Sequence, residues 1–192
     1  MKIKVGVMGS ASDTLPDGVA AAVREKAEAL GKIIAAHDLI LLTGATTGLP
    51  DIVGLATHEA GAFHVGVSPA GSLHEHITNY KLPTDACDLI IYTGFGLKGR
   101  NVVLVRSCDI VLFVGGSIGA LNEFTIAHDE GRIIGCLTGT GGVADEAAHL
   151  LQTFPKQTKG CIFYDDDPSR LLSTCMEALE QLKKDKAVDS NQ

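Results

Sequence analysis

The 192-residue sequence lacks the features that mark several large classes of protein. Its five cysteines are widely spaced and include no C-x-x-C pair, so neither a disulfide framework nor a zinc site is indicated. No apolar run reaches the ~18–20 residues that cross a bilayer. No apolar signal-peptide core of ~7–15 residues precedes the first strand-like segment. We therefore expect a protein of a reducing, cytoplasmic compartment.

Positive charge is also scarce. Lysine and arginine number 16 against 23 acidic residues, which gives a formal net charge of −7. A general binder of nucleic acid or of an anionic membrane needs a basic surface, so neither partner is expected. Hydrophobic residues make up 45% of the chain, which excludes a disordered protein. We expect one domain over residues 1–184 and a polar tail over residues 185–192.

Apolar segments of strand length alternate with segments of helical spacing. The strand-like segments show no polar alternation, which is typical of parallel strands buried on both faces. They are residues 3–8, 38–43, 63–67, 88–92, 109–114, 132–137 and the shorter 161–164. The predicted helices are residues 17–36, 51–60, 100–107, 119–130, 143–151 and 168–184. The pattern predicts an α/β fold, a Rossmann-like, doubly wound and mainly parallel sheet of six or seven strands with helices on both faces.

Small residues follow six of these strands. In a doubly wound sheet, ligands bind outside the carboxyl ends of the strands. Glycine lets backbone N–H groups approach a ligand, and a helix N-terminus favours an anion. Glycine-rich turns of short loops are the alternative explanation. The candidate binding residues are Gly9, Ser10 and Ser12 after the first strand, Thr43, Gly44 and Thr46 after the second, Ser68 after the third, and Gly115, Gly116, Ser117, Ile118 and Gly119 after the fifth.

The loop after the fifth strand gives the sharpest signal. No lysine of the G-x-x-x-x-G-K-[ST] type follows it, which disfavours an ATP-hydrolysing P-loop. The G-x-G-x-x-G spacing of ordinary NAD binding is not met either. Glu123 lies one helical turn past Gly119, so its carboxylate can reach the same crevice. Arg100 can hold a phosphate in bidentate geometry, although a surface arginine and an ordinary helix glutamate remain an alternative.

Several segments together resemble a known family. They are residues 99–101, 107–110 and 115–123, supported by residues 7–12 and 42–50. The sequence is similar, over roughly residues 3–165, to the LOG-like (SLOG) superfamily, which includes phosphoribohydrolases and molybdenum cofactor carrier proteins. The match is closer to the carrier branch, because Asn101 and Val114 stand where the hydrolases usually have lysine and proline. Ala120 replaces the threonine whose hydroxyl would contact a phosphate.

The resemblance implies a ligand and leaves two activities open. A carrier would bind molybdenum cofactor (molybdopterin, a pterin monophosphate) or a similar phosphorylated planar heterocycle for storage or delivery. Arg100, Asn101, the residues from Gly115 to Ala120, and Glu123 would contact it. A hydrolase would instead cleave a nucleoside 5′-monophosphate, with Arg100 and Glu123 as its catalytic pair. A nucleotide-sensing module without chemistry is a third reading. A lysine decarboxylase, the name some relatives carry in error, is rejected because no lysine has a pyridoxal phosphate context.

The same resemblance implies a homodimer or homotetramer, with a molybdoenzyme or a cofactor-inserting protein as recipient. No resident metal is expected. His74 and His76 lack a third ligand in sequence, and we expect their segment, residues 68–86, to act as a lid. The acidic run of Asp165, Asp166 and Asp167 is expected to end the last strand and cap the following helix.

Overall fold

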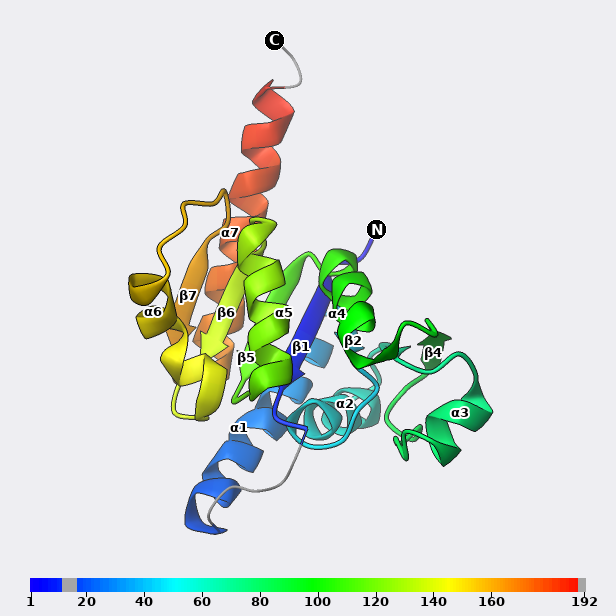
Figure 1. Ribbon diagram of the computed structural model, residues 1–192. Helices are drawn as coiled ribbons and strands as arrows, with labels where there is room; N and C mark the ends of the chain where they lie inside the picture. Colours follow the sequence, from blue (N-terminus) through cyan, green and yellow to red (C-terminus); the bar gives the residue numbers. More distant parts are fainter. Residues whose placement is uncertain (12–16, 190–192) are drawn as a thin grey trace.

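The computed structural model describes residues 1–11 and 17–189 of the chain, in which strands and helices alternate (Figure 1). The strands are β1 (Lys4–Gly9), β2 (Ile40–Thr43), β3 (His64–Ser68), β4 (Leu89–Tyr92), β5 (Ile110–Val114), β6 (Ile133–Leu137) and β7 (Ile162–Asp165). The helices are α1 (Asp17–Ala36), α2 (Leu49–Glu59), α3 (Leu73–Thr78), α4 (Gly96–Ser107), α5 (Ile118–Asp129), α6 (Gly142–Thr153) and α7 (Pro168–Asp189).

The seven strands form one parallel sheet in the order β4-β3-β2-β1-β5-β6-β7. This confirms the predicted α/β, doubly wound architecture. The chain winds outward from β1 to β4 and then returns to add β5 on the other side of β1. The loops after β1 and β5 therefore leave in opposite directions, and a crevice opens between them at the carboxyl edge of the sheet.

Helices cover the sheet on both sides. α1, α2 and α7 pack on one face, and α4, α5 and α6 pack on the other (Figure 1). Phe113 of β5 meets Phe124 of α5 edge to face, with ring centroids 5.5 Å apart. Burial of a side chain of this size contributes ~1.5–3 kcal/mol, so the contact fixes α5 against the strand that precedes it. That contact positions the N-terminus of α5 at the crevice.

Glycine has two different roles in this scaffold. Gly61 and Gly131, which follow α2 and α5, adopt φ values of 84° and 67°, as expected for residues that close a helix. Gly31 lies inside α1 and closes no helix. A Cβ at Gly31 would lie 2.6 Å from the carbonyl oxygen of Val53, so this glycine allows α1 and α2 to pack closely.

Element boundaries differ from the predictions where local signals are weak. α4 begins at Gly96, before the expected Arg100, and α7 continues to Asp189, beyond the expected Lys184. Residues 68–86 contain the short helix α3, which the sequence analysis did not predict. The hydroxyl of Ser72 caps α3 by accepting a hydrogen bond from the Glu75 backbone. Within the described residues, no helix has both the length and the apolar composition to span a membrane.

Candidate functional site

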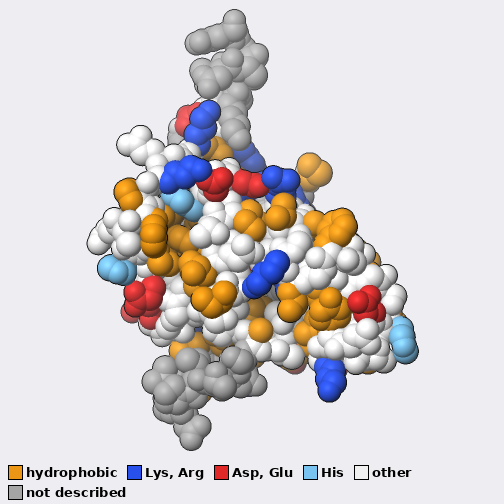
Figure 2. All heavy atoms as spheres, viewed as in Figure 1, with side chains coloured by type: hydrophobic (Ala, Val, Ile, Leu, Met, Phe, Trp, Pro, Cys, Tyr) orange, Lys and Arg blue, Asp and Glu red, His pale blue; other side chains and the backbone are white. Residues whose placement is uncertain are grey.

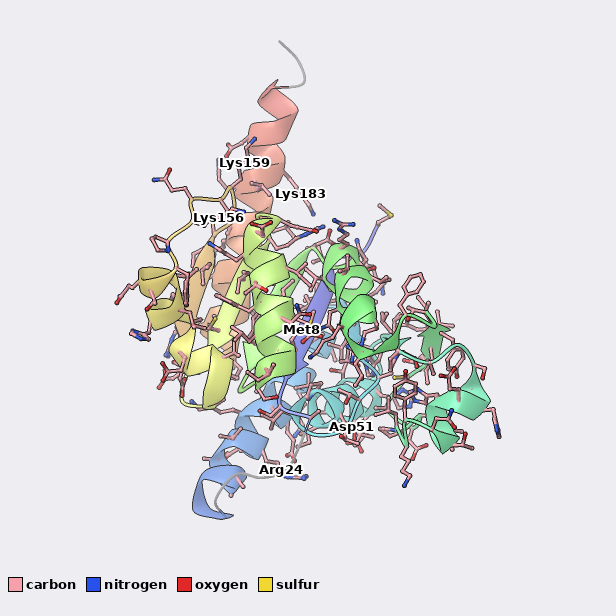
Figure 3. The ribbon with its side chains drawn as sticks, in the orientation of Figure 1. Met8, Arg24, Asp51, Lys156, Lys159 and Lys183 are labelled. Atoms are coloured by element: carbon pink, nitrogen blue, oxygen red, sulfur yellow. The ribbon has the colours of Figure 1, made fainter. Side chains whose placement is uncertain are left out.

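A crevice of about 170 Å³ lies at the carboxyl ends of β1 and β2, between the N-termini of α4 and α5. Met8 lines the crevice from β1 (Figure 3). The structure brings together nine of the predicted site residues here: Gly9, Gly44, Thr46, Arg100, Asn101, Ser117, Gly119, Ala120 and Glu123. Ser12 lies outside the described residues. The crevice is therefore assembled from four separate segments of the chain.

Gly115 and Gly116 shape the loop that leads into α5. Their φ values of 64° and 118° are ones that other residues rarely adopt. The N–H of Gly115 donates to Thr140 Oγ1 at 2.7 Å, and the N–H of Gly116 donates to Ser10 Oγ at 2.9 Å. Both N–H groups are thus engaged within the protein. Ser10 joins the loop after β1 to the loop after β5.

The first turn of α5 presents backbone N–H groups at the crevice. The intrahelical bonds begin with the N–H of Leu121, which donates to the Ser117 carbonyl at 2.9 Å. The N–H groups of Ile118, Gly119 and Ala120 precede that bond, and no described side chain caps them. The positive end of the helix dipole adds to their partial charge. This turn can therefore hold an anion without a change in the backbone.

Arg100 reaches the crevice from α4 with its side chain 7% exposed. Its Nη1 lies 3.4 Å from Glu123 Oε1, while its buried Nε has no hydrogen-bond partner among the residues that the structure describes. The guanidinium lies against Gly44, where a Cβ would come within 2.0 Å of Nη1. Burial lowers the pKa of Arg100 and Glu123 raises it, yet an arginine remains charged in this range. A buried cation with an unpaired donor is a site for an anionic ligand.

Glu123 stands opposite Arg100 and is held by two side chains. Asn101, oriented by its hydrogen-bond partners, donates to Glu123 Oε1 at 3.0 Å and to the carbonyl of Leu97 at 2.9 Å. Burial raises the pKa of Glu123 to about 7, and the charges of Arg100 and Lys98 partly oppose this shift. The carboxyl group is therefore poised between its two protonation states near neutral pH.

Thr43 and Ser68 do not line the crevice, because both are buried at strand ends. The Thr43 hydroxyl accepts from the N–H of Ala45 at 3.2 Å and lies 2.8 Å from His64 Nε2. The Ser68 hydroxyl accepts from the N–H of Ala70 at 3.1 Å and lies 2.8 Å from His76 Nδ1. Each hydroxyl orders the loop that follows its strand. Ile118, Gly115 and Gly116 are likewise not among the residues that line the crevice.

Both of these histidines also contact the connection between α3 and β4. His64 Nδ1 bonds the carbonyl of Ala86, and His76 Nε2 lies 2.9 Å from the carbonyl of Pro83. Burial lowers the pKa of His64 and so favours its neutral ring, in which Nδ1 can donate to the Ala86 carbonyl. His76 is fully buried, whereas His74 is exposed. His76 thus anchors the segment that was expected to be a lid.

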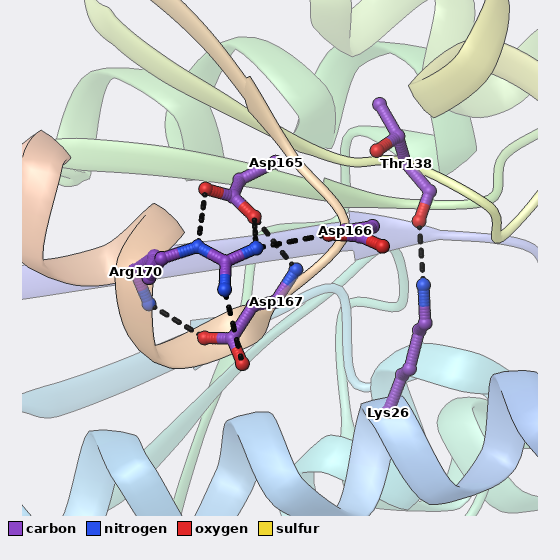
Figure 4. Close-up of polar contacts among 6 residues, drawn as sticks. All are labelled: Lys26, Thr138, Asp165, Asp166, Asp167 and Arg170. Carbon is purple, nitrogen blue, oxygen red and sulfur yellow. Dashed lines mark hydrogen bonds and ion pairs between the residues drawn. The ribbon is translucent and has the colours of Figure 1, made fainter.

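Arg170 forms ion pairs with the acidic run at the end of β7 (Figure 4). Arg170 Nη2 lies 2.7 Å from Asp165 Oδ1 and 3.0 Å from Asp166 Oδ1. Asp167 accepts from the backbone N–H of Arg170 and caps α7, as the sequence indicated. Hydrogen bonds from Arg170 lower the pKa of Asp165 to about 2. Within the described ranges, no group of three or more His, Cys, Asp or Glu residues could hold a metal.

The sequence analysis missed Lys98. It lies in the first turn of α4 and lines the crevice, and its Nζ comes within 3.7 Å of the position that a Cβ on Gly119 would take. The P-loop motif has its phosphate-binding lysine directly after the glycine-rich loop. Lys98 comes instead from the neighbouring helix. Its spacing of two residues from Arg100 was the signal available in the sequence.

A family model described as the SLOG cluster4 family matches residues 2–172. The chain belongs to this family. An uncharacterized protein from Archaeoglobus fulgidus is 27% identical over 133 residues, which cover 69% of this chain and 81% of that relative. The name of that relative states no function.

Solved structures share the whole fold of this SLOG cluster4 chain. The crystal structure of TM1055, a structural genomics target, superposes with a TM-score of 0.78 at 24% identity and covers 93% of this chain and 99% of that one. The molybdenum cofactor carrier protein of Chlamydomonas reinhardtii superposes with a TM-score of 0.68 at 26% identity, covering 94% and 99%. The chain is therefore structurally similar to a protein whose described role is to carry molybdenum cofactor.

Proposed function

We propose that this protein binds molybdenum cofactor as cargo, for storage or delivery, with the phosphate of the pterin in the crevice between α4 and α5. The observation that carries the proposal is the buried guanidinium of Arg100, which lies beside the first turn of α5. Within residues 1–11 and 17–189, its Nε has no partner and no side chain caps that turn. Structural similarity to the algal carrier protein supports the choice of ligand.

The dimensions of the crevice constrain how the ligand sits. Pockets for whole small molecules usually measure ~300–1,000 Å³, whereas this crevice measures about 170 Å³. It accommodates a phosphate and the adjoining atoms, so the planar rings extend past its mouth. Leu97, which lines the crevice and is exposed, offers an apolar surface at that mouth. The protein would hold its cargo by the phosphate and leave part of it accessible for transfer.

A second candidate function is hydrolysis of a nucleoside 5′-monophosphate. The observation that favours it is the pairing of Glu123 with Arg100 in one buried site. In glycosidic bond cleavage, a carboxylate stabilises positive charge that develops on the sugar carbon, while Arg100 would orient the phosphate. The hydrogen bond from Asn101 and the raised pKa of Glu123 both reduce the negative charge available for this role.

The decisive variant is Gly44→Ala. Its Cβ would collide with the guanidinium at the end of the long Arg100 side chain, so we expect the protein to fold with that group displaced. Purified protein is mixed with molybdenum cofactor released from a molybdoenzyme, and protection of the cofactor against oxidation is measured. The wild type should protect it stoichiometrically, and Gly44→Ala should bind at least ~10-fold more weakly. Gly71→Ala is the matched control, because a Cβ there meets no atom closer than 3.4 Å.

Adenine release from adenosine monophosphate tests the second function on the same proteins. Turnover that is abolished in Glu123→Gln, together with no protection of the cofactor by the wild type, would overturn the carrier proposal. Protection without adenine release, and loss of protection in Gly44→Ala alone, is the expected result. Equal protection by Gly44→Ala and the wild type would show that Arg100 does not hold the ligand.

We also propose that the protein self-associates and delivers its cargo to a molybdoenzyme or to a cofactor-inserting protein. Figure 2 shows hydrophobic side chains gathered on the face that α4, α5 and α6 cover. Phe95, Ile118 and Phe154, which lie at the ends of these three helices, are among the exposed large hydrophobic residues. Apolar surface of this kind marks protein contacts in other molecules. A second copy of the chain is the occupant to which we assign it.

A further inference from the structure

The first turn of α5 and the neighbouring turn of α4 direct several hydrogen-bond donors into the crevice. Within the described residues, Ser117 makes no capping hydrogen bond, so the N–H groups of Ile118, Gly119 and Ala120 are uncapped. The Asn101 amide is engaged by Glu123 and the Leu97 carbonyl, which leaves the three N–H groups, the Ser117 hydroxyl and the Arg100 guanidinium as donors besides Lys98. A phosphate with several charged oxygens leaves part of its charge uncompensated by these donors alone.

Lys98 is placed to compensate that charge. Its ammonium group lies over Gly119 in the first turn of α5, at 3.7 Å from the position of a Cβ. Within residues 1–11 and 17–189, no carboxylate forms an ion pair with it, although its charge acts on Glu123. Gly119 itself leaves the space open, because no side chain stands between the ammonium group and the backbone of α5. Lys98 therefore lies beside the first turn of α5, to which the N–H groups of Ile118, Gly119 and Ala120 belong.

Besides the N-terminus of α5, the site contains a buried charged side chain, Arg100. Its side chain is more than nine-tenths buried, lines the same crevice and carries the unpartnered Nε. Two cations from one turn of α4 thus converge with the positive end of α5. Against them stands one carboxyl group, Glu123, whose charge is reduced near neutral pH. The balance of charge in the crevice favours a ligand group with two negative charges.

We infer that Lys98 is a ligand-contacting residue that makes the crevice selective for the dianion of a phosphate monoester over a phosphodiester. The inference deepens the proposed function and rests on it for the identity of the natural ligand. A monoester carries about two negative charges above its second pKa of ~6, whereas a diester carries one. Lys98 is exposed, so its contribution decreases as salt screens the interaction.

The test uses methyl phosphate and dimethyl phosphate as probes, with ¹⁵N-labelled protein at pH 7 and low salt. Binding is followed by NMR at the amides of Ile118, Gly119 and Ala120. Methyl phosphate should shift these amides, and dimethyl phosphate should bind at least ~10-fold more weakly. Lys98→Gln should weaken methyl phosphate about tenfold and reduce the preference over the diester. Lys98→Arg should keep most of the affinity, because the charge remains.

Lys159→Gln is the matched control, since it removes the same charge from an exposed lysine away from the crevice. It should leave the affinity within about twofold of the wild type. Equal binding of methyl phosphate by Lys98→Gln and Lys159→Gln would overturn the inference. So would the absence of any shift at the three amides of the wild type.

Cofactor protection by the same variants separates this inference from the proposed function. Lys98-dependent binding of methyl phosphate, without protection of molybdenum cofactor, would retain Lys98 as a phosphate ligand and reject the proposed cargo. Protection of the cofactor that Lys98→Gln does not weaken, at low or high salt, would retain the cargo and reject the role of Lys98.

Discussion

Arg100 and Glu123 are each removed from water, and each reduces the free-energy cost of burying the other. Their Nη1–Oε1 distance of 3.4 Å is long for a charge-assisted hydrogen bond, and Asn101 takes part of the capacity of the same carboxyl oxygen. An incoming phosphate would find the guanidinium only partly committed. This arrangement keeps a buried arginine available for a ligand.

The raised pKa of Glu123 predicts a pH-dependent stability. The carboxyl group binds its proton more tightly in the folded protein, with a pKa of about 7, than in the unfolded chain, where the value is 4.5. Its contribution is complete below pH 4.5 and is lost as the pH rises through about 7. We expect the free energy of unfolding, measured with urea at pH 5 and pH 8, to decline across this range by up to ~3 kcal/mol from this group.

Glu123→Gln should remove this decline, because an amide does not titrate. Glu177→Gln, at an exposed position on α7, is the control and should retain the profile of the wild type. Only the difference between the two pH values is compared, so any constant effect of leaving Arg100 unpaired cancels. Parallel profiles for the wild type and Glu123→Gln would contradict the assignment of a raised pKa to Glu123.

At the scale of elements, hydrogen bonds between loops hold the site together. Ser10 connects the loop after β1 to Gly116, and Thr140 connects the loop after β6 to Gly115. The backbone of Val143 and Ala144 donates back to the carbonyls of Gly116 and Gly115. Across the acidic turn, Lys26 of α1 donates to the carbonyl of Thr138 at 2.9 Å (Figure 4). The carboxyl edge of the sheet is thus a connected layer, which fixes the first turn of α5.

His76 holds the segment around α3 against the end of β3, whereas His74 on the same helix is exposed. Substitution of these two histidines should therefore affect stability to different extents. His76→Ala removes hydrogen bonds to Ser68 and Pro83 and leaves buried groups without partners, which should destabilise the protein by ~2–4 kcal/mol. His74→Ala, on the exposed side of the same helix, should change stability by less than ~0.5 kcal/mol. Urea unfolding measures both values, and hydrogen exchange of residues 80–87 should accelerate only in His76→Ala. Similar effects of the two substitutions would refute the anchoring role.

At the scale of the whole molecule, the apolar side chains that remain exposed predict self-association. Phe95, Ile118 and Phe154 are 66%, 74% and 71% exposed, on the face formed by α4, α5 and α6. Burying them in a second copy removes apolar surface from water. Sedimentation velocity should therefore show species of two or four times the chain mass of 20.1 kDa. A single species at the chain mass over the whole concentration range would exclude the predicted oligomer.

The order of the elements, the parallel sheet and the family resemblance could all be predicted from the amino-acid sequence. Strand and helix periods, and glycines that follow helices or strands, are local signals that survive without tertiary information. Arg100 and Glu123 were also found from spacing within a motif. The short helix α3 was missed because six residues carry too little periodicity, although Ser72 and Glu75 have the spacing of a capping pair.

Which strand-end groups face the crevice could not be predicted from the sequence, because it depends on tertiary packing. Thr43 and Ser68 look like ligand contacts in sequence, yet the Thr43 hydroxyl is turned inward to His64 and the Ser68 hydroxyl to His76. The N–H groups of Gly115 and Gly116 are likewise taken by residues that are remote in the chain. Lys98 becomes a crevice residue because α4 packs beside α5. Hydrogen-bond partners and neighbouring charges depend on which elements pack together, and no local pattern in the sequence specifies that packing.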